Sequence, residues 1–127
     1  MTTKMRVLVI DDDRDVVESV CIRLGAAGYQ TLFAFDGREG VDSAIENNPD
    51  AIVLDVRMPE LDGMGALAEL KQHPVTREIP VVMLSASLVD QHAALRVGAS
   101  YFVIKPYSPT NLIAALESAI RQSAYAG

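Results

Sequence analysis

The chain has 127 residues, of which half are hydrophobic and 22% are charged. This length and composition fit one globular domain with its own core, and they exclude an intrinsically disordered segment. The net charge is −6 and no cluster of Lys or Arg is present, so we expect no direct binding of DNA or RNA.

The single cysteine, Cys21, cannot form an intrachain disulfide, and its apolar surroundings indicate a packed residue. The sequence shows no signal-peptide pattern and no run of the ~20 apolar residues that a membrane span needs. We therefore expect a cytoplasmic protein that does not bind membranes.

Five short apolar runs alternate with amphipathic stretches along the chain. The runs are residues 6–10, 30–34, 51–55, 80–84 and 101–105. Most of their residues are β-branched or aliphatic, which is typical of parallel strands buried on both faces.

The segments that follow these runs have the apolar spacing of helices. We expect helices from about 14 to 27, from Asp36 to just before Asn47, from about Asp62 to His73, from Ser87 to Gly98, and from Ser108 to about Ser123. The residues expected to cap their N-termini are Asp13, Asp36, Asp62, Ser87 and Ser108. The final residues, 123–127, have the composition of a frayed tail.

Five β-α units in succession predict an α/β fold: a doubly wound five-stranded parallel sheet with helices on both faces. We expect the flavodoxin-like strand order 2-1-3-4-5. In such sheets ligands bind beyond the carboxyl ends of the strands, so the residues that end each strand are the candidate functional residues.

Reactive side chains follow four of the five predicted strands. They are Asp11 and Asp12 after the first, Asp55 at the end of the third, Ser85 after the fourth and Lys105 at the end of the fifth. Strands one, three, four and five are neighbours in the expected order, so we predict that these side chains converge at one edge of the sheet.

Such a cluster has a specific chemical capacity. Three carboxylates within several ångströms repel one another unless a cation joins them, and hard oxygen ligands indicate Mg²⁺ or Mn²⁺. Lys105 can hold a phosphate oxygen and Ser85 can donate a hydroxyl proton. The set is suited to transferring a phosphoryl group onto an aspartate.

Other sites are less consistent with the sequence. His73 and His92 lie far apart in polar contexts, so we expect neither to bind metal. The spacing Asp11-x-Asp13-x-Asp15 resembles the start of an EF-hand loop, but Val16 replaces its required glycine. Neither a P-loop nor a GxGxxG motif is present, and three aspartates would repel a flavin phosphate.

The chain resembles the receiver domains of two-component response regulators from about Lys4 to Arg121. The matching segments are VLVIDDD, IVLDVRMPELDGM, VVMLSA and GASYFVIKPYS. The resemblance implies one receiver domain over residues 1–127, with a core of about 4–121 and a tail of 122–127. This domain is either a complete response regulator or part of a longer protein.

The resemblance implies that Asp55 accepts a phosphoryl group from a sensor histidine kinase or a phosphotransfer protein. Asp12 would bind Mg²⁺ directly, Asp11 would bind it through water, and the backbone carbonyl of Arg57 would supply a further oxygen. Ser85 and Lys105 would hold phosphoryl oxygens, and the Lys105–Pro106 peptide bond would be cis.

The resemblance also implies a conformational switch. Ser85 would move toward the phosphoryl group and Phe102 would turn into the vacated space. The surface of the fourth helix, fifth strand and fifth helix would then change toward an unknown output partner or domain. The fifth helix offers only Glu117 and Arg121 as charged residues in LIAALESAIRQ, so the chain is expected to be a monomer or a weak dimer.

Two other functions use the same residues. A hydrolase of the haloacid-dehalogenase type would use Asp11 as its nucleophile, although Asp15 does not match the final position of that motif and the chain lacks room for a cap domain. A binding module with a vestigial pocket would not need the full set of site residues. The expected protein is therefore not a turnover enzyme but a domain that phosphorylates and dephosphorylates itself.

Overall fold

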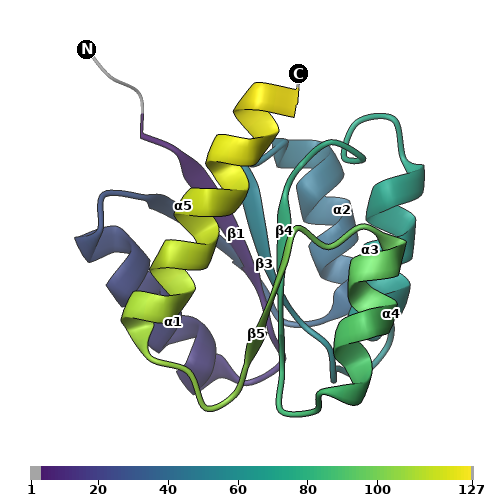
Figure 1. The fold of residues 1–127 in the computed structure, drawn as a ribbon, viewed down its shortest axis with the longest axis horizontal. Coiled ribbons are helices and arrows are strands. Elements are labelled where there is room, and N and C mark those ends of the chain that lie inside the picture. The colour runs from purple at the N-terminus through teal and green to yellow at the C-terminus, as the bar shows by residue number, and fades with distance from the viewer. Residues whose placement is uncertain (1–3, 127) are drawn as a thin grey trace.

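Five strands and five helices alternate along the chain in the computed structural model, which describes residues 4–126 and the side chains of residues 4–123 (Figure 1). The strands are β1 (Arg6–Ile10), β2 (Gln30–Ala34), β3 (Ala51–Asp55), β4 (Val81–Ser85) and β5 (Tyr101–Ile104). The helices are α1 (Arg14–Ala26), α2 (Gly37–Asn47), α3 (Gly63–Gln72), α4 (Val89–Val97) and α5 (Pro109–Ala126).

All strand pairs are parallel, and the sheet order is β2-β1-β3-β4-β5, as predicted. Helices α1 and α5 cover one face of the sheet, while α2, α3 and α4 cover the other (Figure 1). Every crossover passes through a helix, so all five strands end at the same edge of the sheet.

The core consists of two layers, one on each face of the sheet. Successive side chains of a strand point to opposite faces, so each central strand contributes to both layers. On β1, Leu8 and Ile10 face α2 and α3, whereas Val7 and Val9 face α1 and α5. This double burial explains why the central strands have continuous apolar sequences.

The expectation that all five strands are buried on both faces is wrong for the two edge strands. On β2 the side chain of Phe33 is 56% exposed, and every residue of β5 is only partly buried. An edge strand has a neighbour on one side alone, and the helices beside it cover its outer surface incompletely.

Most predicted helix starts are confirmed. The carboxylates of Asp13, Asp36 and Asp62 accept backbone N–H groups at the starts of α1, α2 and α3, and the hydroxyl of Ser108 accepts the N–H of Asn111 in α5. At the other end of the chain, the helix extends to Ala126, beyond the predicted end at about Ser123, and Gly127 lies outside the described residues. The frayed tail stays a prediction.

The predicted start of α4 at Ser87 is wrong. The helix begins at Val89, and the residue before it, Leu88, has no side chain that can cap it. Ser87 instead donates its N–H to the hydroxyl of Ser85 at 3.1 Å, while its own hydroxyl accepts the N–H of Val89 at 3.3 Å. These bonds form a tight turn after β4, which delays the helix.

The helices of this fold are too short or too polar for a bilayer. Within residues 4–126, no helix has both the length and the apolar composition to span a membrane. The longest, α5, has 18 residues and packs Leu112, Leu116 and Ala119 against the sheet.

Candidate functional site: the acidic edge of the sheet

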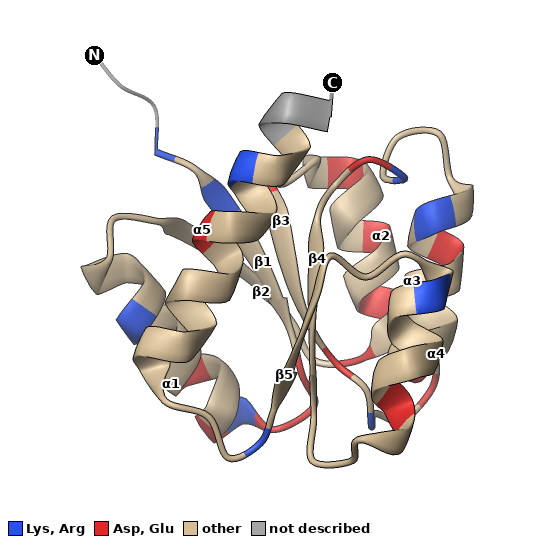
Figure 2. Cartoon of the chain, viewed as in Figure 1, with Lys and Arg blue, Asp and Glu red and all other residues tan. Residues whose placement is uncertain are grey.

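Acidic residues gather at the edge where the strands end, and a basic residue follows β5 at the same edge (Figure 2). Asp11 and Asp12 follow β1, and Asp55 ends β3. Since Ile10 pairs with Leu54 in the sheet, the two strand ends lie side by side. Carboxylate oxygens of Asp11, Asp12 and Asp55, which we call the acid cluster, all lie within 4.8 Å of one another.

Asp11, like Asp55, is a buried member of the acid cluster, with 3% of its surface exposed. Its Oδ1 accepts the N–H of Asp13 at 3.0 Å, but its Oδ2 is a buried atom without a hydrogen-bond partner among the described residues. Burial, with the charges of Asp55 and Asp12, raises the pKa of Asp11 to about 6, although the Asp13 N–H and the Lys105 ammonium act in the opposite direction.

Lys105 brings a positive charge to the acid cluster. Its Nζ lies 2.5 Å from Asp55 Oδ1 and 4.0 Å from Asp11 Oδ2. Burial alone would lower the pKa of Lys105, but the hydrogen bond and charge of Asp55 outweigh it, so the pKa is raised. The Lys105–Pro106 peptide bond is cis, as expected.

The backbone after β3 holds Asp55 in place. Asp55 Oδ2 accepts the N–H of Arg57 at 3.2 Å, and the N–H of Gly63 donates to the carbonyl of Val56 at 2.8 Å. A Cβ atom on Gly63 would lie 2.1 Å from the carbonyl oxygen of Asp55. Only glycine therefore allows α3 to begin this close to the end of β3.

Ser85 ends β4, next to β3 in the sheet, but its hydroxyl bonds to a residue outside the acid cluster. It donates to Oδ2 of Asp90 at 2.8 Å. The same carboxylate receives Nη2 of Arg57, which lies 3.3 Å from Oδ2 and 3.4 Å from Oδ1. The predicted convergence is thus confirmed for Asp11, Asp12, Asp55 and Lys105, while Ser85 has a different partner.

The sequence reasoning missed Asp90. A signal was available, because Asp90 stands three residues after Ser87, the spacing of a capping-box acid. That pattern would have placed its carboxylate on the helix backbone. In the structure the carboxylate reaches back to the end of β4, which the local sequence does not encode.

The remaining predicted residues have simpler environments. Phe102 is partly buried and packs against the core layer beneath α2, α3 and α4. Cys21 is partly buried, and burial raises the pKa of its thiol. His92 is exposed, and Nδ1 of His73 accepts the N–H of Val75.

The acid cluster has the donor set of a magnesium or manganese site. All of its donors are carboxylate oxygens, which these hard cations prefer, and neither a thiol nor an imidazole belongs to it. Oδ2 of Asp11 is buried and has no hydrogen-bond partner among the described residues, so it is free to coordinate a cation. These observations fit a divalent cation.

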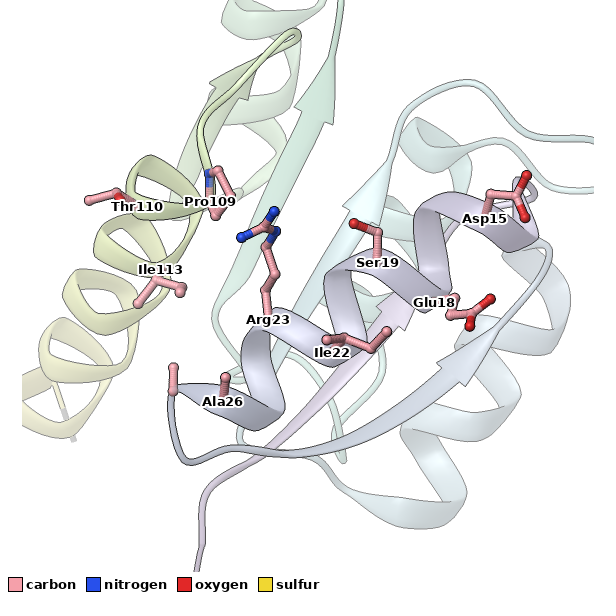
Figure 3. A pocket seen from close by; sticks show the side chains of 10 residues that line it. Asp15, Glu18, Ser19, Ile22, Arg23, Ala26, Pro109, Thr110 and Ile113 are labelled. Carbon is pink, nitrogen blue, oxygen red and sulfur yellow. The ribbon is translucent and has the colours of Figure 1, made fainter.

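A groove of about 780 Å³ lies between α1 and α5 (Figure 3). Arg23 of α1 and Pro109 of α5 line it from opposite sides, with Ile22 and Ile113 contributing apolar surface. The acid cluster lies outside this lining, so the groove is a surface separate from the one where the strands end.

Comparison with known proteins identifies the fold and the family. The family model described as response regulator receiver domain matches residues 7–117. The transcriptional regulatory protein PrrA of Mycobacterium bovis is 41% identical over 122 residues, which cover 94% of this chain and 52% of that protein. The chain spans about half the length of the curated relatives it matches.

Solved structures agree with this result. The receiver domain of Francisella response regulator 1452 has a TM-score of 0.87 and 32% identity, and the match covers 94% of this chain and 99% of that one. The receiver domain of the Pseudomonas aeruginosa sensor histidine kinase PA1611, which holds a magnesium ion in its active-site cleft, has a TM-score of 0.86 and 28% identity over 93% of this chain and 98% of that one. The chain belongs to the response regulator receiver domain family of two-component signalling.

Proposed function

We propose that Asp55 is the phosphoacceptor of this receiver domain, with a phosphohistidine of a sensor histidine kinase or phosphotransfer protein as the donor. The observation that carries the proposal is the position of Asp55. Asp55 is buried, with 4% of its surface exposed, and its Oδ1 lies 2.5 Å from Nζ of Lys105. Its carboxylate belongs to the cluster of three. Asp11 and Asp12 lie beside Asp55. Lys105 is farther from Asp11, whose Oδ2 lies 4.0 Å from Nζ.

In the proposed reaction an oxygen of Asp55 attacks the phosphorus atom. The bond between phosphorus and the donor nitrogen breaks, its electron pair stays on the imidazole ring, and an acyl phosphate forms on Asp55. Lys105 follows the transferred group and holds one of its oxygens, since its ammonium already contacts the attacking carboxylate. Ser85 donates its hydroxyl proton to another phosphoryl oxygen.

Asp11, Asp12, Asp55 and the backbone carbonyl of Arg57 are the proposed ligands of Mg²⁺, with Mn²⁺ as a substitute. When bound, the cation neutralises the charge that accumulates on the phosphoryl oxygens. The buried, unpartnered Asp11 Oδ2 supports this assignment because it is an oxygen already desolvated for a cation.

The response to phosphorylation is a change of surface. Ser85 ends β4 and Phe102 lies on β5, where its neighbour across the sheet is Met83. Movement of Ser85 toward Asp55 would vacate space that Phe102 can occupy. We propose that this shift changes the surface of α4, β5 and α5, which regulates an output partner or an output domain.

The domain is proposed to act as a signalling module and not as a turnover enzyme, with phosphorylation and slow hydrolysis at Asp55 as its only chemistry. The curated relatives named as transcriptional regulators support an output in gene regulation. Residues 1–127 as one domain, and a cytoplasmic location, stay predictions.

Mass spectrometry tests the acceptor directly. After incubation with acetyl phosphate and Mg²⁺, the chain should gain the mass of one phosphoryl group. Asp55→Asn should abolish the gain, because a carboxamide is a poor nucleophile. Asp42→Asn, at an exposed position on α2, is the matched control and should be phosphorylated like the unchanged chain.

Two results would reject the acceptor assignment. The first is a phosphoryl gain that survives Asp55→Asn, or no gain at all, as a vestigial pocket would give. The second is turnover of a generic phosphate ester that Asp11→Asn abolishes and Asp55→Asn does not, which would indicate the hydrolase.

A further inference from the structure

Asp90 joins the acceptor site to the first turn of α4. Its side chain is 14% exposed and binds two groups that neighbour Asp55. The Ser85 hydroxyl donates to Oδ2 at 2.8 Å, and the Arg57 guanidinium lies 3.3 Å from the same oxygen. The side chain of Arg57 is 75% exposed, so the bond with Ser85 is the better shielded of the two.

The hydrogen bond to Asp90 uses the one hydrogen that the Ser85 hydroxyl can donate. A serine hydroxyl has one proton to donate, and this proton goes to Asp90. Its oxygen accepts the N–H of Ser87 at 3.1 Å. A phosphoryl oxygen on Asp55 therefore has to compete with the Asp90 carboxylate for the same hydrogen. Both competitors are anions, so each offers a charge-assisted hydrogen bond.

The same contact lies at the start of α4, a helix with little buried surface. Among the described residues of this helix, only Ala94 is buried, compared with three or four residues in each of α1, α2 and α3. The N-cap residue Leu88 makes no side-chain hydrogen bond, and Leu88 and Val89 at the start of the helix are 68% and 84% exposed. The bond from Asp90 to Ser85 thus connects a weakly packed turn to the end of β4.

We propose that Asp90 is a positioning residue that keeps the Ser85 hydroxyl away from Asp55 in the unphosphorylated domain. On phosphorylation, the Ser85 hydroxyl donates its hydrogen bond to the phosphoryl group in place of Asp90. The first turn of α4 then loses its connection to β4. This inference rests on the proposed function of Asp55. Asp90 thereby sets the fraction of molecules in which the Ser85 hydroxyl can donate to a phosphoryl group. The smaller this fraction is, the more acetyl phosphate is needed to phosphorylate half of the protein.

A double-mutant cycle between Asp90 and Ser85 tests the proposal. Acetyl phosphate is titrated with Mg²⁺ in excess, and the phosphorylated fraction is measured by mass spectrometry. Asp90→Ala should lower the acetyl phosphate concentration for half-phosphorylation about 3- to 10-fold, since a charge-assisted hydrogen bond no longer competes. In the Ser85→Ala background, Asp90→Ala should have no further effect. Asp90→Glu, which retains the carboxylate, should restore the behaviour of the unchanged chain at least partly.

Glu39→Gln is the matched control, because it removes an acid from the first turn of α2, which has no contact with Ser85. It should leave the titration unchanged. An effect of Asp90→Ala that persists without Ser85 would assign the change to charge or to the freed Arg57 and would overturn the proposal, as would an unchanged titration.

Failure of the proposed function has a different signature, since the unchanged chain itself would not be phosphorylated on Asp55. Circular dichroism and thermal unfolding establish that each variant is folded. If Asp90→Ala does not fold, Asp90→Asn replaces it in the cycle. The amide keeps the size of the side chain but accepts a weaker, uncharged hydrogen bond, so a smaller shift in the same direction is expected, and no shift overturns the proposal.

Discussion

The ionised carboxylate of Asp11 destabilises the folded domain when no metal is bound. Its carboxyl is buried, one of its oxygens lacks a partner within the described structure, and two other carboxylates lie beside it. Its pKa of about 6 lies above the ordinary value of 3.8, so the fold favours the protonated form. This stabilising contribution is fully present below pH 3.8 and is lost as the pH rises through 6.

Asp11→Asn should therefore stabilise the metal-free protein. At pH 7 the ionised carboxyl costs about 3 kcal/mol on the basis of its raised pKa, so we expect a gain of about 1–3 kcal/mol in the free energy of unfolding. The gain should shrink as the pH falls from 7 to 4, where Asp11 binds a proton. Urea unfolding in the presence of a chelator measures it.

Asp42→Asn serves as the control in the same experiment. Its position is exposed, so its effect should stay within about 0.5 kcal/mol. A variant at Asp11 that is less stable than the unchanged chain at pH 7 would show that the carboxylate is not strained by burial.

The residues of the acid cluster could be predicted because strand ends are visible in the sequence and the order of parallel strands follows general rules. Asp11, Asp12, Asp55 and Lys105 meet for that reason. The contact of Asp90 could not be predicted in this way. Its carboxylate chooses between a helix backbone and Ser85, and the choice depends on the three-dimensional turn after β4.

At the scale of elements, α4 differs from its neighbours. It is the shortest helix, with 9 residues, and Ala94 is its buried residue among those described. By contrast, α3 buries Ala66, Leu67 and Leu70 against the sheet. Buried apolar surface is the main source of helix stability in proteins, so α4 belongs to the least stable part of the fold.

Hydrogen exchange should reveal this difference. In the unphosphorylated protein, backbone amides in the last two turns of α4 should exchange at least about tenfold faster than those of α3, which corresponds to about 1.4 kcal/mol less protection. The measurement is exchange mass spectrometry or NMR at constant pH. Equal protection of α3 and α4 would show that the two helices open together with the whole domain.

The boundaries of the elements show where sequence patterns succeed and fail. Four helix starts follow from a side chain that bonds to the next few N–H groups, and a local pattern captures such a contact. The start of α4 differs because Ser87 bonds within the turn and not to the third residue of a helix. The same limit applies to β2, where exposure of Phe33 depends on the position of the strand at the edge of the sheet.

At the scale of the whole molecule, the fold separates stability from chemistry. The two core layers lie on the faces of the sheet, and the acid cluster lies at its edge. A cation at that edge should therefore add stability without a change in the core. It would bind the folded state, in which the three carboxylates meet, and not the unfolded chain.

Addition of Mg²⁺ should raise the midpoint of thermal unfolding. At a concentration of about 100 times the dissociation constant, linkage predicts about 2.7 kcal/mol of added stability. Asp12→Asn should reduce this shift because it removes one of the proposed ligands, while Asp42→Asn should retain it. A shift of equal size in both variants would place the cation elsewhere.

Gly63 limits the substitutions that the protein can accept during evolution. Any side chain there would collide with the peptide of Asp55, although residue 63 has no functional group of its own. In a saturation scan read out by signalling, this position should behave as if it carried chemistry and reject even alanine. The proposed acceptor, Asp55, is thus constrained twice: once by the chemistry of its carboxylate and once by a neighbouring residue that cannot carry a side chain.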